Sequence, residues 1–158
     1  MHKIIISTLL LTSFTLAGPS YSFFGVQTSY LDYNHVSSPS LGLKYGVQQG
    51  MWRTTLNLDY AKSSNDTLTS FIIQADKGIL QSAMKDSPFK PYVGFSLGML
   101  QHDNSGTDKG YGIGLNTGVS YLLNDAIDLD LGYRYLSTSK MNNIKSLNSL
   151  NLSLHYFY

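Results

Sequence analysis

The sequence predicts an all-β fold, an eight-stranded antiparallel up-and-down barrel that crosses a membrane with its strands. Three observations indicate it. Apolar residues recur at every second position along eight stretches, which is typical of strands with one apolar face. The positions between them hold mainly Gly, Ser, Asn and Gln rather than the Lys and Glu of a hydrated surface. The chain also ends on such a stretch, whose apolar face consists of Leu150, Leu152, Leu154, Tyr156 and Tyr158.

Length and composition narrow the function classes. A chain of 158 residues is the size of one domain. It contains no cysteine, so disulfides and cysteine-zinc sites are excluded. The 11 basic residues nearly balance the 10 acidic ones, so no basic excess indicates nucleic-acid binding. The 12 Tyr and 14 Gly suit sheets and tight turns better than helices.

The first 22 residues are predicted to be a cleaved signal peptide. Lys3 supplies the positive start, and residues 4–17 form an apolar run broken only by Ser and Thr. This run is shorter than the roughly 20 residues that a membrane-spanning helix needs. Residues 20–22 read Ser-Tyr-Ser, a small-x-small cleavage site, and Ala17 is a rival one. The expected barrel domain is therefore 23–158.

The eight predicted strands are separated by clusters of turn-forming residues. They cover residues 23–33, 40–48, 51–61, 68–79, 92–101, 110–122, 126–136 and 150–158. Short turns are expected at 49–50 and 124–125. Four longer polar loops are expected at the opposite end, at 34–39, 62–67, 102–109 and 137–146.

The fourth strand and the connection after it are the least regular parts. Ile72 falls on the polar face, Lys77 falls on the apolar face, and Gly78 suggests a bulge. The connection 81–91 is long for a turn and leaves room for a helical turn. Pro88 and Pro91 are expected to keep it out of the sheet.

The polar face decides which side of the barrel is inside. A soluble barrel would put the apolar face inward, whereas a membrane barrel puts it against lipid. Small residues with few, nearly balanced charges suit a lumen that eight strands leave just wide enough for side chains. The predicted lumen charges are Lys44, Arg53, Asp59, Asp76, Asp128, Asp130 and Arg134. His155 also alternates inward and is expected to be hydrogen-bonded there.

Aromatic residues on the apolar face cluster near both ends of the predicted strands. Two such girdles, one at each membrane interface, are typical of outer-membrane barrels. The predicted girdle residues are Phe24, Tyr30, Trp52, Tyr60, Tyr111, Tyr121, Tyr133 and Tyr135, with Tyr156 and Tyr158 at the chain end.

Three segments carry a resemblance to a known family: 91–98 (PYVGFSLG), 129–135 (LDLGYRY) and 154–158 (LHYFY). The mature chain resembles the small eight-stranded outer-membrane β-barrel superfamily of the OmpA, OmpX and opacity-protein type. This resemblance implies a Gram-negative outer membrane, surrounding lipid and lipopolysaccharide, and a monomer. It also implies that Leu154, Tyr156 and Tyr158 form an insertion signal for the barrel assembly machinery.

Fold does not fix activity, so several functions stay open. The first is a non-enzymatic structural or surface-interaction role through the outer loops, with an unidentified host or cell-surface ligand. The second is a small pore. The third is a lipid A-modifying enzyme, for which His35-Val36-Ser37 with Asp32 is the only matching pattern. No cofactor or metal is expected; His102, Asp103 and Asp108 could hold a cation, but a solvated loop is the simpler interpretation.

Overall fold

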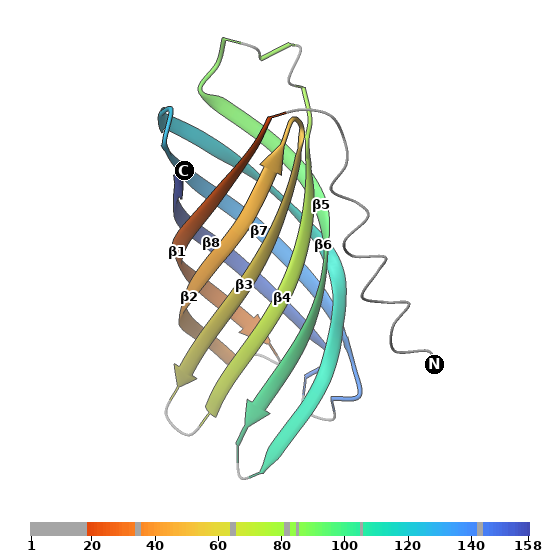
Figure 1. Cartoon of the computed structure of the whole chain (residues 1–158). Coiled ribbons are helices and arrows are strands. Elements are labelled where there is room, and N and C mark those ends of the chain that lie inside the picture. The colour runs from red at the N-terminus through yellow and green to blue at the C-terminus, as the bar shows by residue number, and fades with distance from the viewer. Residues whose placement is uncertain are drawn as a thin grey trace, which may run out of the picture.

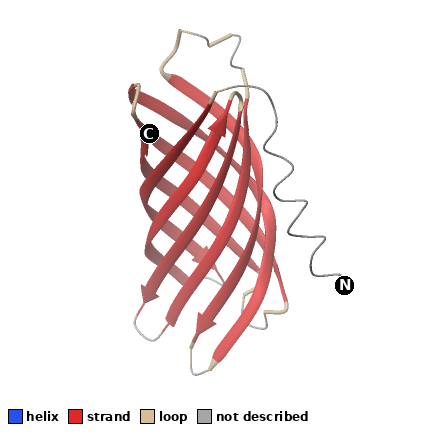
Figure 2. Cartoon of the chain, in the orientation of Figure 1, coloured by secondary structure: helices blue, strands red, loops and turns tan. Residues whose placement is uncertain are grey.

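The computed structural model describes residues 19–33, 36–63, 66–80, 83–84, 86–104, 106–141 and 144–158. These residues form one closed antiparallel barrel in which each strand pairs with its neighbours in sequence (Figure 1). Figure 2 shows only strands and loops in this part of the chain. No helix long and apolar enough to cross a bilayer occurs in it. The strands are β1 (Ser20–Tyr33), β2 (Val36–Gln49), β3 (Trp52–Ser63), β4 (Asp66–Gly78), β5 (Phe89–Asp103), β6 (Thr107–Asn124), β7 (Ile127–Ser139) and β8 (Ser146–Phe157).

The last strand closes the barrel against the first, as the sequence predicts. β8 pairs with β1 from Phe23↔Phe157 to Asp32↔Asn148. One residue beyond β8, the amide of Tyr158 donates a hydrogen bond of 3.0 Å to the carbonyl oxygen of Ser22. Closure leaves no unpaired strand edge, so the backbone polar groups are satisfied within lipid.

Alternation along the strands sorts the side chains as predicted. Outward Leu115 is 69% exposed, whereas Gln27 on the polar face of β1 is 3% exposed. One end of the barrel holds the start of β1, the end of β8 and the short turns 50–51 and 125–126. We assign this end to the periplasm. Gly50, with φ of 57°, adopts the left-handed conformation that the tight β2–β3 turn requires.

The lumen is divided into two zones along its axis. Charged and amide side chains fill its middle and periplasmic part. Its outer part is filled by an apolar cluster, which explains why Ile72 interrupts the polar face of β4. This outer plug consists of Leu31, Tyr33, Ala61, Leu68, Ile72, Leu100, Leu136, Ile144 and Leu147, with Met141 packed against it.

The predicted outer loops are wrong in extent, because the strands continue through most of them. Only residues 34–35, 64–65, 104–106 and 140–145 separate the strands at that end. Pairs such as Asp32↔Ser37 and Asp103↔Thr107 extend the ladders beyond the predicted strand ends. Ser, Asp and Thr in these segments reflect exposure of the protruding strands to water rather than loss of pairing. The β5–β6 hairpin reaches furthest (Figure 1).

The bulge predicted at Gly78 is wrong, and the irregular pairing lies in another strand. Pairing through Gly78 is regular, and the register shift falls between Leu122 and Asn124. Pro91 lies inside β5, where its carbonyl oxygen accepts a 2.9 Å hydrogen bond from the amide of Ile79. A proline whose ring nitrogen is not needed by the ladder fits a strand near its end.

Two backbone hydrogen bonds lie within the described part of the long periplasmic connection. The amide of Met84 donates to the carbonyl oxygen of Leu80 at 2.9 Å, and the amide of Ser87 donates to the carbonyl oxygen of Met84 at 3.2 Å. The predicted signal peptide lies outside the described residues up to position 18. Residues 20–22 belong to β1 and pair with β2.

Candidate functional site

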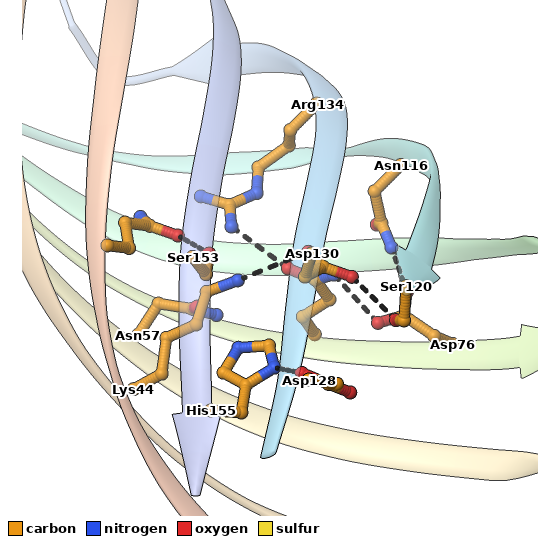
Figure 3. A network of polar contacts seen from close by, with 12 residues as sticks. Lys44, Asn57, Asp76, Asn116, Ser120, Asp128, Asp130, Arg134, Ser153 and His155 are labelled. Atoms are coloured by element: carbon orange, nitrogen blue, oxygen red, sulfur yellow. Dashed lines mark hydrogen bonds and ion pairs between the residues drawn. The ribbon is translucent and has the colours of Figure 1, made fainter. Parts of the chain in front are cut away.

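The charged side chains of the lumen are joined by ion pairs and hydrogen bonds in two groups, one around Asp128 and Asp130 and the other around Arg134 and Asp76 (Figure 3). The seven predicted lumen charges all point inward and lie against one another or against amides and hydroxyls. The network draws its members from all eight strands, because each strand contributes every second residue. Isolated charges in so dry a space would be costly, so pairing is a condition for placing them there.

The periplasmic part of the network is centred on Asp128. Its Oδ2 lies 2.9 Å from Nη2 of Arg53, and its Oδ1 lies 2.7 Å from Nδ1 of His155. The register Asp128↔His155 brings the second pair together across β7 and β8. The Arg53 guanidinium also lies 5.3 Å from the ring centre of Phe23 and 5.8 Å from that of Phe157. These two rings cover the charge toward the periplasm.

Asp130 is the second centre, one step further into the lumen. It lies 3.8 Å from Nζ of Lys44 and 3.7 Å from Nη1 of Arg53. The hydroxyls of Tyr92 and Ser120 donate to its two oxygens at 3.1 and 2.9 Å. Each carboxylate oxygen therefore has a donor, which offsets its burial.

Amide side chains connect the remaining charges. Arg134 lies 3.6 Å from Asp59 and donates at 2.9 Å to Oε1 of Gln74. Nε2 of Gln74 in turn donates at 2.7 Å to Asp76, which also accepts from Asn116. The sequence pattern placed these amides inward but could not name their partners. The cross-strand register decides them, and only the closed barrel fixes it.

Little room remains inside this network. A cavity of about 30 Å³, lined by residues that include Arg53, Asp76 and Tyr92, lies toward the periplasmic end. This volume suits one or two water molecules. Further out, the apolar plug fills the lumen. The arrangement binds side chains to one another rather than presenting them to a ligand.

The predicted girdle residues all face outward. Their exposed fractions run from 37% for Tyr121 to 65% for Tyr158. Lys77, the one cation on the apolar face of β4, lies with its Nζ 5.5 Å from the ring centre of the paired Trp52. Leu154, Tyr156 and Tyr158 of the predicted insertion signal also face outward.

The other candidate residues lie at the outer end. His102, predicted in a solvated loop, is instead buried on β5, with Nε2 3.6 Å from Asp66 and its ring against Tyr33. In the described part of the chain, no three His or Asp side chains are placed to hold a metal ion. Asp103, at the protruding tip, accepts a hydrogen bond from Thr107 that holds the pKa of its carboxyl below the usual range.

The pattern proposed for lipid A chemistry is described only in part. His35 lies outside the described residues. Ser37 is exposed on β2 and is paired with Asp32 on β1.

Comparison with known proteins identifies the family. The model of the Opacity family porin proteins matches residues 26–157, nearly the whole barrel. The chain belongs to this family. It is an outer-membrane β-barrel protein of the kind found in Gram-negative bacteria. No curated protein matches its sequence.

Several solved structures share the fold. Neisserial surface protein A (NspA) superposes with a TM-score of 0.70 at 22% identity, covering 88% of this chain and 97% of that one. The N-terminal barrel of Pseudomonas aeruginosa OprF gives 0.60 at 13% identity, with 89% and 100% covered. Ail, the attachment invasion locus protein of Yersinia pestis, gives 0.52 at 13% identity, with 90% and 100% covered. At these identities the likeness establishes the fold alone.

Proposed function

We propose that this opacity-family barrel is a non-enzymatic surface protein that makes its contacts through the outer ends of its strands. The observation that carries the proposal is the filled lumen. Paired charges occupy its periplasmic and middle parts and the apolar plug occupies its outer part. A barrel whose lumen is filled in this way over the described residues offers its exterior and its outer rim to partners.

The contact surface is formed by paired strands rather than by flexible loops. β6 spans Thr107–Asn124, well beyond the roughly 9–11 residues that a tilted strand needs to cross a bilayer. The excess lies partly at the outer end, where the β5–β6 hairpin projects (Figure 1). Such a rigid edge loses little conformational entropy on binding. The names of two structural neighbours, a surface protein and an attachment protein, suit a role of this kind.

The test compares binding of cells to matrix-coated or host-cell surfaces. A host strain would display the wild-type barrel, the tip variant Asp103→Ala/Asn104→Ala/Thr107→Ala, or the periplasmic control Asp86→Ala/Ser87→Ala/Asp125→Ala. We expect the tip variant alone to lose binding at equal outer-membrane levels. Equal binding by all three proteins, or none above an empty-vector strain, would refute a contact role for the tip.

The pore alternative is tested separately with purified wild-type barrel in planar bilayers. We expect no discrete conductance steps, because paired charges and the apolar plug fill the lumen over the part of the chain that the structure describes. Reproducible steps that change in size when Leu136 is replaced by Ala would establish a pore instead. Comparing lipid A masses from cells with wild type and Ser37→Ala tests the enzyme alternative, for which we expect identical spectra.

A further inference from the structure

A groove on the lipid-facing surface of β4, β5 and β6 combines apolar and cationic lining. Its volume is about 390 Å³. The register places Phe71, Met99 and Tyr111 side by side in one row across the three strands. The next row toward the outer end holds Thr69, Gln101 and Lys109. The groove therefore changes from apolar to polar along the membrane normal.

A second cation reaches the groove from β7. Tyr111 pairs with Ser139, the last residue of β7, and Lys140 follows it. Lys140 has a φ of 62°, which ends the extended path of the strand there. Its Nζ lies 5.4 Å from the ring centre of Tyr111. Lys109 and Lys140 thus both line the outer part of the groove.

A second groove on the lipid-facing surface has an apolar lining without outward-pointing cations. It has a volume of about 330 Å³ and lies over β1, β2 and β3, with Phe24, Leu43 and Leu56 in its lining, and it meets the first groove at Phe71 of β4. Its only charged lining residue is Lys44, whose Nζ points into the lumen toward Asp130 at 3.8 Å. A hydrocarbon chain alone would fit either groove, so the outward lysines distinguish the first.

The depth of the first groove decides what its lysines face. The apolar row suits the acyl layer, and the polar row one step further out suits the headgroup layer. Ammonium groups on flexible stems at this boundary complement phosphate. We propose that the groove binds a phosphorylated glycolipid of the outer leaflet, with an acyl chain against Phe71, Met99 and Tyr111 and a phosphate between Lys109 and Lys140. The proposal goes beyond the contact role of the tip and rests only on the outer-membrane location.

One acid opposes this charge complementarity. Asp103 follows Gln101 on the same face of β5, one step nearer the outer tip. Nε2 of Gln101 donates a hydrogen bond of 2.9 Å to the carboxylate of Asp103. Its carboxylate interacts with Lys109 and would repel a phosphate. Replacing Asp103 with Asn keeps the shape and removes the charge. This variant should bind the lipid more tightly than the wild type.

Native mass spectrometry of the folded barrel in detergent micelles can measure the binding directly. The probes are diphosphoryl lipid A and the same lipid with both phosphates removed. The groove variant is Lys109→Gln/Lys140→Gln. The matched control is Lys62→Gln/Lys145→Gln, which removes two exposed outer lysines that do not line the groove. Heat-modifiable gel mobility verifies that each variant is folded.

We expect the groove variant to bind diphosphoryl lipid A about 5- to 30-fold more weakly, since each lysine at an anionic lipid surface contributes roughly fivefold. The control should stay within about twofold of wild type on the same scale. Dephosphorylated lipid A should bind wild type and groove variant equally. Equal losses in the two double variants would show diffuse charge attraction and overturn the proposal. Equal binding of both lipids to the wild type would also overturn it.

Discussion

Replacing Asp128 with Leu should destabilise the barrel more than any single substitution on its lipid-facing surface. The side chain is fully buried, and its carboxylate holds both Arg53 at 2.9 Å and His155 at 2.7 Å. Without it, Arg53 keeps Asp130 at 3.7 Å and the side chain of Gln48. His155 loses the only acid within salt-bridge distance among the described residues.

The size of the effect follows from the charge left behind. Two unit charges about 4 Å apart attract by roughly 4 kcal/mol at an effective dielectric constant of 20. Removing one partner of a buried pair typically costs about 3–5 kcal/mol, because the other charge stays desolvated. Removing both partners as Arg53→Met/Asp128→Leu leaves neither member of this pair without the other, and Asp130, which also loses Arg53, keeps Lys44 at 3.8 Å. We therefore expect the double variant to be less destabilised than the sum of the singles by at least about 2 kcal/mol.

Trp52 makes the measurement simple, because it is the only tryptophan in the chain. It faces lipid at the periplasmic end of β3, so its emission should change when the barrel unfolds. Urea unfolding in lipid vesicles would give the free energies for wild type, Arg53→Met, Asp128→Leu and the double variant. A coupling energy below about 0.5 kcal/mol, the size expected of independent sites, would refute the pairing argument.

Three further predictions concern the plug, the closing strand and the start of the mature chain. Leu136→Ala should lower the free energy of unfolding by about 2–4 kcal/mol, whereas Leu115→Ala on the lipid face should cost less than half as much; equal costs in urea titrations would contradict a packed plug. Deleting residues 156–158 removes the last two pairs of β8 with β1, Phe24↔Tyr156 and Phe23↔Phe157, and should reduce folded barrel in the outer membrane more than the tip variant does, as measured by gel mobility of membrane fractions. Residues 20–22 pair with β2, which favours cleavage of the signal peptide after Ala17. The intact mass of the mature protein should therefore correspond to a chain that starts at position 18. A mass that corresponds to a start at position 23 would contradict this prediction.

The architecture was predictable because strand periodicity is a local property. Alternation along Leu150–Tyr158 and its seven counterparts fixes which side chains share a face, and a barrel needs only that knowledge to sort lipid from lumen. The ends of the strands were not predictable in the same way. Residues 36–39 and 107–109 have the composition of loops, yet they lie in β2 and β6. Polar side chains are acceptable there because water surrounds the protruding ends of the strands.

The lumen shows where sequence reasoning ends. Asp130 and Arg134 share the inward face of β7, with Gly132 between them on that face. Periodicity identifies both side chains as inward. It does not show that Arg134 lies against Asp59 while Asp130 lies near Lys44 and Arg53. These contacts cross the barrel between strands far apart in the sequence. They depend on the stagger of all eight strands, which no single stretch encodes.

The two zones of the lumen have different consequences for register. Sliding β7 by one residue against its neighbours would turn Asp128, Asp130 and Arg134 toward lipid and turn leucines into the charged zone. A cation at the bilayer centre costs about 2–4 kcal/mol, and the buried partners left behind add to that cost. A slip at the plug residues Leu68 and Leu147 would bring neutral Thr, Ser or Asn side chains into the plug, which carries a smaller penalty than a displaced charge. The charges therefore select the register, and the plug supplies packing once the register is set. Replacing the ion pairs by leucines should preserve much of the stability while allowing misregistered barrels, visible as additional bands in heat-modifiability gels.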